Sequence, residues 1–210
     1  MVLLDADKIS FGYSPEKILI DRLCFNLSRG ESLGVTGENG SGKTTLAKLL
    51  VGILKPVAGA IFLEKTDLKR LSLGRIGEKI GYVMQNPEIQ LLMPSVEEEI
   101  TFGLRMRGCN ERKIKKKSED LLQFFEIESL LKAPVFTLST GEKQRLAMAA
   151  VLALEPRLLI LDEPTAGLDP LRKAKLGYLL DKLLQNGLGL ILISHDTAFI
   201  RQHCEKNLSL

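Results

Sequence analysis

A glycine-rich segment early in the chain has the composition of a phosphate-binding loop. It reads Gly37-Glu38-Asn39-Gly40-Ser41-Gly42-Lys43-Thr44, which fits the pattern GxxxxGK[ST]. Glycines let successive backbone N–H groups turn toward a phosphate without a Cβ clash, and the helix expected after the loop directs its positive dipole end at the same anion. Lys43 is therefore predicted to reach the β- and γ-phosphates, and the Thr44 hydroxyl to bind Mg²⁺. A plain glycine-rich turn before a helix is the alternative.

Two acids follow an apolar run much later in the chain. Asp162 and Glu163 come directly after the run 158–161, which consists of leucine and isoleucine. In an open parallel sheet the ligand lies beyond the carboxyl ends of the strands, so both acids are expected beside the nucleotide. Asp162 suits Mg²⁺, directly or through water, and Glu163 suits a base for the attacking water. The alternative is that the two acids only keep the end of the strand in contact with water. This alternative is disfavoured because the upstream phosphate-binding loop needs such a pair of acids.

A third segment, Leu138-Ser139-Thr140-Gly141-Glu142, opens a predicted helix. Ser139 and Glu142 fit the capping box S-x-x-E, which accounts for this pair without any ligand. Considered alone, the segment is therefore better explained as a helix start than as a binding site.

The elements that must position these segments follow from hydrophobic periodicity and from turn residues. Ser95, with acids in the turn that follows it, predicts a helix start, and residues 95–154 are expected to be mostly helical. A turn is expected at 14–16. Strands are expected at 8–13, 18–27, 31–35, 60–63, 80–83, 158–161 and 188–193, and further helices at 111–125, 139–154 and 170–185.

Bulk composition is that of an ordinary globular protein of 210 residues, with 45% hydrophobic and 26% charged residues. A net charge of +3 is too small to indicate nucleic-acid binding, and the basic run 112–117 is better explained as a solvated helix face. No apolar run approaches the ~18–20 residues that span a bilayer. We expect no signal peptide, because no basic region precedes an apolar stretch at the N-terminus.

The order of the motifs resembles that of the ATP-binding cassette (ABC) ATPases. It comprises the phosphate loop, Gln85, the segment 138–142, the acids at 162–163, Ala166-Gly167-Leu168-Asp169 and Ser194-His195-Asp196. The resemblance implies an α/β fold in which a P-loop NTPase core, with a mixed, mainly parallel sheet and an antiparallel β subdomain, carries an inserted helical subdomain. Residues 1–210 would form a single ABC ATPase domain, with the helical signature subdomain at about 95–154.

The resemblance also implies a role for individual residues, with ATP and Mg²⁺ as cofactors. Tyr13 would stack on adenine, although an exposed turn tyrosine is the alternative. Gln85 would touch Mg²⁺ and the lytic water, His195 would contact the γ-phosphate, and Asp169 would face a partner subunit. The implied catalytic residues are Glu163, His195 and Gln85; the metal ligands are Thr44, Gln85 and Asp162; the nucleotide contacts are Tyr13, Gly37, Glu38, Asn39, Gly40, Ser41, Gly42, Lys43, Thr44, Thr45, Ser139 and Gly141.

Two features depart from the family pattern. The family signature is usually LSGGQ and here reads LSTGE, so that Thr140 adds a Cβ and Glu142 a negative charge near an anion. The sequence also stops at Leu210, inside an expected strand and without the C-terminal helical region that often helps these subunits pair. We therefore expect the isolated chain to be largely monomeric and a weak ATPase.

Two stretches, 85–90 and 95–104, are similar to the ATPase subunits of energy-coupling factor importers, which take up vitamins or transition-metal ions such as cobalt and nickel. This similarity implies three partners: a second ABC ATPase subunit in a homodimer or heterodimer, a transmembrane coupling protein and a substrate-binding membrane protein. It implies a peripheral position at the cytoplasmic face of the cell membrane and no nucleic-acid partner. Every motif addresses ATP, so the sequence does not identify the transported substrate.

The alternative is a soluble ABC ATPase that acts in translation or DNA repair. Translation-type members carry two cassettes, whereas this sequence contains one, and repair-type members insert long coiled coils for which the interval between Thr44 and Leu138 is too short. A P-loop nucleotide kinase would leave the signature, Asp169 and His195 unexplained.

Overall fold

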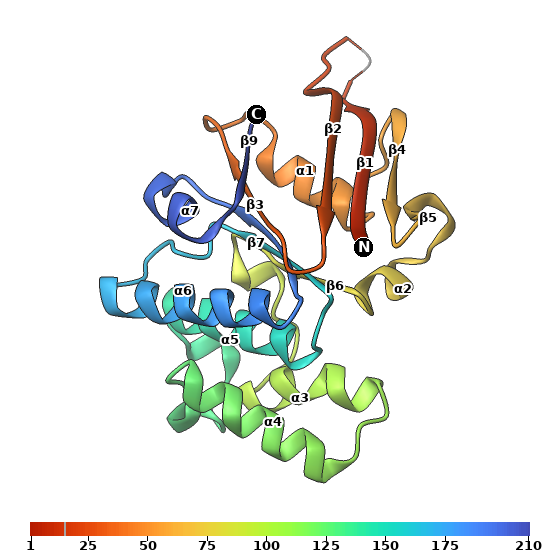
Figure 1. Cartoon of the computed structure of the whole chain (residues 1–210). Helices are drawn as coiled ribbons and strands as arrows, with labels where there is room; N and C mark the ends of the chain where they lie inside the picture. The colour runs from red at the N-terminus through yellow and green to blue at the C-terminus, as the bar shows by residue number, and fades with distance from the viewer. Residues whose placement is uncertain (15) are drawn as a thin grey trace. The chain divides into compact units, whose positions relative to one another are not determined.

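The computed structural model describes residues 1–14 and 16–210 (Figure 1), so Pro15 of the expected turn lies outside the described part. The chain divides into two compact units. The first combines Met1–Tyr82 with Pro156–Leu210, and the second is Val83–Glu155. Within the described part of the chain, no helix combines the length and the apolar composition needed to cross a bilayer.

A five-stranded sheet with the order β6-β7-β8-β3-β9 is the centre of the first unit. Neighbours β7 and β8, β8 and β3, and β3 and β9 pair in parallel, with Ser32 opposite Leu190 and Leu158 opposite Gly189. All residues of β7 and β8 are buried, as their continuous apolar sequences predict for strands covered on both faces. The bounds are β3 Ser32–Thr36, β6 Ile80–Val83, β7 Leu158–Asp162, β8 Gly189–Ile193 and β9 Lys206–Ser209.

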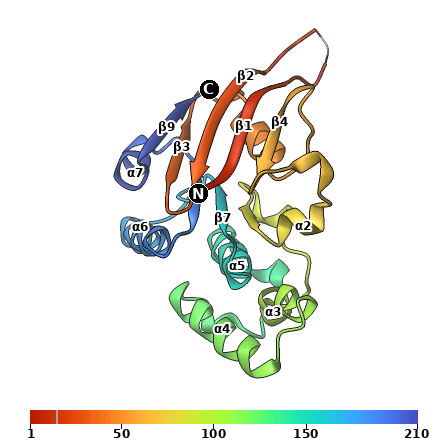
Figure 2. The ribbon, with the colours of Figure 1, turned by 45° about the vertical axis from the view of Figure 1, so that its right-hand side comes forward.

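A second, antiparallel sheet with the order β2-β1-β4-β5 belongs to the same unit. Its central strand β1 begins at Val2, six residues before the expected start, because it pairs with β2 on one side and β4 on the other. Figure 2 shows these strands as a twisted ribbon. The bounds are β1 Val2–Phe11, β2 Ile20–Ser28, β4 Ala58–Leu63 and β5 Thr66–Asp67.

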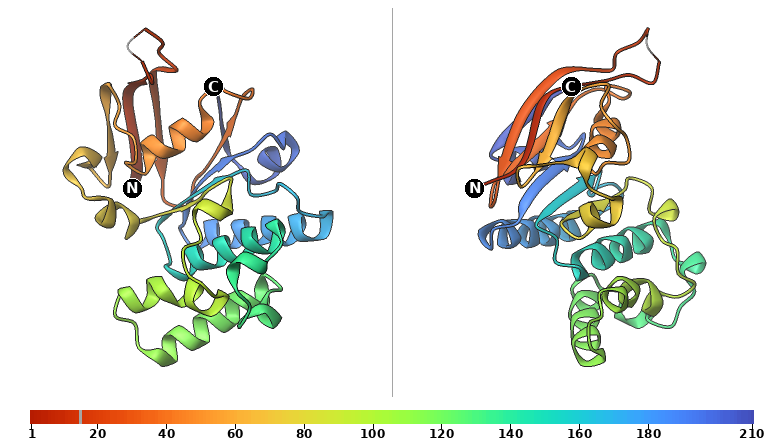
Figure 3. Two further views of the ribbon diagram at one scale, coloured as in Figure 1. Left: turned by 180° about the vertical axis from the view of Figure 1, so that it is seen from behind. Right: turned by 90° about the vertical axis from the view of Figure 1, so that its right-hand side faces the viewer.

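Helix α1 shares one apolar core with both sheets. The two ribbon views show the helix beside the strands of this unit (Figure 3). Leu46 of α1, Ile9 of β1 and Ile160 of β7 are all fully buried in this core. Burying each such side chain stabilises the fold by about 1.5–3 kcal/mol. Helices α6 and α7 pack against each other and follow β7 and β8 in the chain. The bounds are α1 Lys43–Leu50, α2 Leu73–Gly77, α6 Pro170–Gln185 and α7 Thr197–His203, with a 3₁₀ turn at Leu68–Arg70.

The second unit is helical. Ser95 and Ser139 cap their helices as predicted: each hydroxyl accepts the backbone N–H three residues on. Ile100, Ile114 and Leu146 contribute to its buried apolar interior. Its helices are α3 Val96–Met106, α4 Glu111–Phe124 and α5 Thr140–Ala153, with 3₁₀ turns at Pro87–Ile89, Glu128–Leu130 and Val135–Thr137.

The predicted α/β fold class is thus confirmed, with a parallel sheet, an antiparallel sheet and a helical region. That residues 95–154 work as a separate signature subdomain stays a prediction.

Candidate active site

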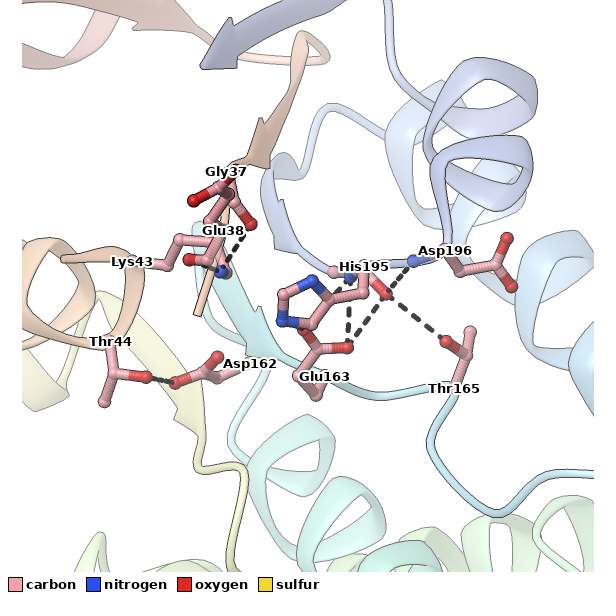
Figure 4. Close-up of polar contacts among 10 residues, drawn as sticks. Gly37, Glu38, Lys43, Thr44, Asp162, Glu163, Thr165, His195 and Asp196 are labelled. Carbon is pink, nitrogen blue, oxygen red and sulfur yellow. Dashed lines mark hydrogen bonds and ion pairs between the residues drawn. The ribbon is translucent and has the colours of Figure 1, made fainter. Parts of the chain in front are cut away.

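The glycine-rich segment connects β3 to α1 and is shaped around the Lys43 side chain. The Lys43 ammonium donates hydrogen bonds of 2.8 Å to the carbonyl oxygens of Gly37 and Glu38 (Figure 4). Gly42 precedes α1 with a φ of +105°, a conformation that side chains disfavour. A Cβ at Gly37 would lie 2.6 Å from the Ser41 hydroxyl oxygen, so glycine is required there as well. The loop is therefore held tightly closed around the ammonium group.

Two observations fit this loop to a phosphate. Among the residues that the structure describes, no side chain caps the first turn of α1, so its backbone N–H groups are available to an anion. The buried Ser41 hydroxyl oxygen has no hydrogen-bond partner among the described residues. A phosphate oxygen would satisfy such donors.

Thr44 and Asp162 meet beside the loop. The Thr44 hydroxyl donates a hydrogen bond of 2.8 Å to Asp162 Oδ2, and the Tyr82 hydroxyl lies 3.4 Å from the same oxygen. Burial raises the pKa of Asp162, and the Glu163 charge raises it further, whereas the Thr44 hydrogen bond lowers it. Burial, together with Asp162, also raises the pKa of Tyr82. Tyr82 was not predicted as a site residue; its position at the end of β6, next to β7, was the available signal.

The hydroxyl of Thr44 and the carboxylate of Asp162 are oxygen donors of the kind that Mg²⁺ prefers. The described residues contain no group of three or more His, Cys, Asp or Glu side chains that could hold a metal ion alone. This donor set fits Mg²⁺, which keeps several waters and uses substrate phosphates as ligands.

Glu163 leaves β7 at a sharp bend and points to the end of β8. Its φ of +53° is unusual for a residue with a side chain and costs on the order of 1–2 kcal/mol. Its backbone N–H donates to the Ile193 carbonyl at 2.8 Å. The backbone N–H of His195 lies 3.0 and 3.3 Å from its two carboxylate oxygens, and His195 Nε2 lies 3.5 Å from Oε1. The predicted base and the histidine predicted to contact the γ-phosphate are therefore in contact (Figure 4).

Ser194 was quoted in a motif but was not predicted as a site residue. Its hydroxyl donates to Glu163 Oε2 at 3.1 Å and lies 3.5 Å from the Thr165 hydroxyl. The signal in the sequence was its place directly after the apolar run 188–193.

Tyr13 lies beside the start of α1. Its hydroxyl is 3.0 Å from the Thr45 hydroxyl, and its ring meets the ring of Phe11 edge-on at 5.1 Å. The side chain is otherwise exposed, which leaves a ring face open to a flat ligand.

The remaining predicted residues, Gln85, Ser139 and Gly141, belong to the second unit. Ser139 and Glu142 form the predicted capping box: the Ser139 N–H donates to Glu142 Oε2 at 2.8 Å, and the Glu142 N–H to the Ser139 hydroxyl at 3.4 Å. Gly141 follows in the first turn of α5, and a Cβ there would meet no heavy atom closer than 3.8 Å. The first unit contains the other predicted residues: Tyr13, Gly37, Glu38, Asn39, Gly40, Ser41, Gly42, Lys43, Thr44, Thr45, Asp162, Glu163 and His195.

Comparison with known families gives one match: the family model described as ABC transporter matches residues 20–166. A putative ABC transporter ATP-binding protein of Vibrio vulnificus is 37% identical over 207 residues, which cover 98% of this chain and 36% of the relative. A protein of the same description from Methanosarcina acetivorans is 40% identical over a stretch that covers 92% of this chain and 34% of the relative. The chain thus spans about a third of the length of these relatives.

Solved structures agree. CbiO1 of Clostridium perfringens, described as part of the ABC transporter complex CbiONQ, is 34% identical with a TM-score of 0.85, covering 99% of this chain and 84% of that one. The ATP-binding cassette MJ0796, solved as a dimer with ADP and phosphate, is 25% identical with a TM-score of 0.89, covering 99% and 94%.

Proposed function

Because this chain belongs to the ABC transporter family of ATP-binding ATPases, we propose that it binds ATP with Mg²⁺ and hydrolyses the nucleotide to power a membrane importer. The observation that carries this proposal is the convergence of three groups in the first unit. Lys43 follows β3, Asp162 ends β7 and Glu163 contacts His195 after β8. The carboxyl ends of these parallel strands are where an open α/β sheet places its ligand.

The chemistry divides among these residues. Lys43 would neutralise the β- and γ-phosphates, and Thr44 with Asp162 would hold Mg²⁺, which when bound would neutralise charge on the phosphate oxygens. Glu163 accepts a proton from the attacking water at its carboxylate. His195, half exposed and in contact with Glu163, contacts the γ-phosphate. Tyr13 stacks on the adenine.

The site is proposed to be completed by a second cassette. Ser139 and Gly141 of one subunit would direct the start of α5 at the γ-phosphate bound by the other, and Asp169 would face the partner. The dimer of MJ0796 with ADP and phosphate supports this arrangement. Gln85 would contact the Mg²⁺ and the lytic water.

The transporter is proposed to be of the energy-coupling factor type, in which this subunit works with a transmembrane coupling protein and a substrate-binding membrane protein at the cytoplasmic face of the membrane. The likeness to CbiO1 supports this branch. The cargo would be a vitamin or a transition-metal ion.

Two measurements test the proposal. ATP hydrolysis by the purified chain is expected to require Mg²⁺ and to rise more than linearly with protein concentration, because each site needs a second subunit. Affinity capture from detergent-solubilised membranes of the source organism is expected to retain a polytopic membrane protein. Failure to hydrolyse ATP at any concentration would refute the enzymatic part, and enrichment of ribosomal or DNA-repair proteins instead would refute the importer.

A further inference from the structure

We infer that Ser194 is a positioning residue that sets the orientation of the Glu163 carboxylate for hydrolysis. This inference rests on the proposed function, in which Glu163 is the base. Ser194 follows β8 directly, is 1% exposed and lies in the first unit together with Glu163. Its hydroxyl oxygen lies within 3.5 Å of three polar groups: the Glu163 carboxylate, the Asp196 backbone N–H and the Thr165 hydroxyl. Figure 4 labels these three residues.

The donors and acceptors around Ser194 assign its hydroxyl hydrogen. The backbone N–H of Asp196 can only donate, and it does so to Ser194 Oγ at 3.1 Å. The carboxylate of Glu163 can only accept, so the hydroxyl hydrogen of Ser194 points to Oε2 at 3.1 Å. The Thr165 hydroxyl, 3.5 Å away, is then left to donate to Ser194 rather than to accept from it.

This hydrogen bond acts with the backbone N–H of His195, which lies 3.0 and 3.3 Å from the two oxygens, to fix the rotation of the Glu163 carboxylate about its terminal bond. Ser194 engages Oε2, whereas His195 Nε2 lies 3.5 Å from Oε1. A carboxylate rotates easily about its terminal bond, because such sp³–sp² torsions have broad minima. By engaging one oxygen, the Ser194 hydroxyl therefore keeps the carboxylate plane in the orientation that directs the other oxygen toward the imidazole.

The connection between β8 and α7, residues 194–196, which carries Ser194, is itself held in place by several contacts. The Asp196 carboxylate caps α7 by accepting the Phe199 N–H at 3.0 Å and forms an ion pair with Lys173 of α6. These contacts hold the pKa of Asp196 below its usual range, with the Lys173 hydrogen bond as the main cause. A donor on a fixed connection suits the role, since displacing a reacting group by ~1 Å can cost up to 100-fold in rate.

The test is single-turnover ATP hydrolysis at high protein concentration, with ATP affinity measured in parallel. Ser194→Ala is expected to lower the hydrolysis rate roughly tenfold or more while ATP affinity changes by less than about twofold. Ser194→Thr keeps the hydroxyl and is expected to retain most of the rate. Ser194→Cys has a side chain of similar size but a weaker hydrogen-bond donor, and its hydrolysis rate is expected to fall as in Ser194→Ala. This variant tests the role of the hydroxyl if the alanine variant does not fold.

Ser32→Ala is the matched control. Ser32 is also 1% exposed, lies at the opposite end of the same sheet, and accepts the backbone N–H of Glu205 at 3.0 Å. Its loss removes a buried hydrogen bond of the same kind without touching Glu163, so the hydrolysis rate is expected to stay unchanged.

A double-mutant cycle distinguishes positioning from a general structural role. In the Glu163→Gln background, Ser194→Ala is expected to have little further effect, because it acts through the carboxylate. Equal losses in both backgrounds, an undiminished rate in Ser194→Ala, or a loss of ATP affinity as large as the loss of rate would each overturn the inference. Failure of the unaltered chain to bind or hydrolyse ATP would instead refute the proposed function.

Discussion

The hydroxyl of Thr44 lies 2.8 Å from Oδ2 of Asp162, although 118 positions separate the two residues in the chain. The parallel pairing of β7, β8 and β3 accounts for this contact, since it brings the carboxyl ends of the strands to one edge. The two residues proposed to hold Mg²⁺ are therefore aligned by the sheet itself.

Replacing Lys43 with alanine is expected to weaken ATP binding by roughly 10- to 100-fold, because hydrogen bonds to charged groups contribute about 1.5–3 kcal/mol each. Isothermal titration with ATP measures the change. Lys48→Ala, near the other end of α1, is the control and is expected to bind ATP normally. Near-normal ATP affinity in Lys43→Ala would contradict the assignment of the phosphate loop.

Glu163→Gln is expected to bind ATP and to lower hydrolysis to a residual rate that only single-turnover assays detect, since the amide keeps the shape of the side chain and loses the base. ATP should then trap a dimer, visible as a doubled mass in light scattering. Glu155→Gln is a useful control, because Glu155 also has a positive φ, of +48°, and lies in the second unit; its turnover is expected to stay normal. Continued turnover by a monomeric Glu163→Gln would exclude the proposed role.

The rate of ATP hydrolysis is expected to rise when Thr140→Gly is combined with Glu142→Gln in the signature segment 138–142. Removing a negative charge ~4 Å from an anion is worth about 1 kcal/mol where solvent keeps the effective dielectric at ~80, or a several-fold rate increase if it acts only in the transition state. Glutamine keeps an acceptor oxygen for the Ser139 N–H, which now donates to Glu142 at 2.8 Å.

Turnover and thermal unfolding of the double and single variants should be measured together. In a heterodimer only the site facing this subunit would gain. Lower activity accompanied by a lower melting temperature would show that Glu142 serves mainly to cap α5, and LSTGE would then be a structural variant with full function.

Stability is expected to fall in acid because of Glu64. Its carboxylate accepts hydrogen bonds from Lys79, Arg157 and Arg29, the first at 2.7 Å, which lower its pKa from 4.5 to about 2. A lowered carboxyl pKa stabilises the fold above the unfolded value and loses that effect as the pH falls through the folded value. The free energy of unfolding should thus decline from about pH 5 to pH 2, by roughly 1–2 kcal/mol given the exposure of the arginines.

Denaturant titrations across this range check the expectation. Glu64→Gln should be less stable at neutral pH and show a flatter decline in acid, and Lys79→Gln should lie between that variant and the unaltered chain. An unchanged pH dependence in Glu64→Gln would rule out this ion-pair cluster as the source.

Gly177→Ala is expected to disrupt the packing of α6 against α7 and so to lower the stability of the fold. An added Cβ would lie 2.4 Å from His203 Nε2, and the His203 ring is buried against Phe199 and bonded to Asp181 at 2.8 Å. Overpacking of this kind costs about 1–3 kcal/mol. Turnover should fall as well, because α7 follows His195 directly.

Gly74→Ala is the control for this steric effect, since its Cβ would meet only the Ser72 hydroxyl oxygen at 3.9 Å. Thermal unfolding is the measurement. Equal melting temperatures for the two alanine variants would contradict the steric argument.

Local patterns in the sequence were sufficient for the glycine-rich loop between β3 and α1, for the buried strands β7 and β8 and for the helix starts at Ser95 and Ser139. Each of these depends on residues that are neighbours in the chain: glycines that permit a turn, apolar runs, and a hydroxyl three positions before an N–H. The first half of β1 was missed, because its pairing with β2 and β4, and not its own periodicity, makes it a strand.

Contacts between distant segments were decided only by the tertiary structure. Tyr82 reaches Asp162 because β6 lies next to β7, and Ser194 reaches Glu163 because β8 pairs with β7 in a register that opposes Asp162 to Ile193. Neither contact is visible in the sequence, since the order and register of strands depend on how the whole apolar core packs. The sequence determined which residues could do chemistry, and the order and register of the strands decided which of those side chains contact one another.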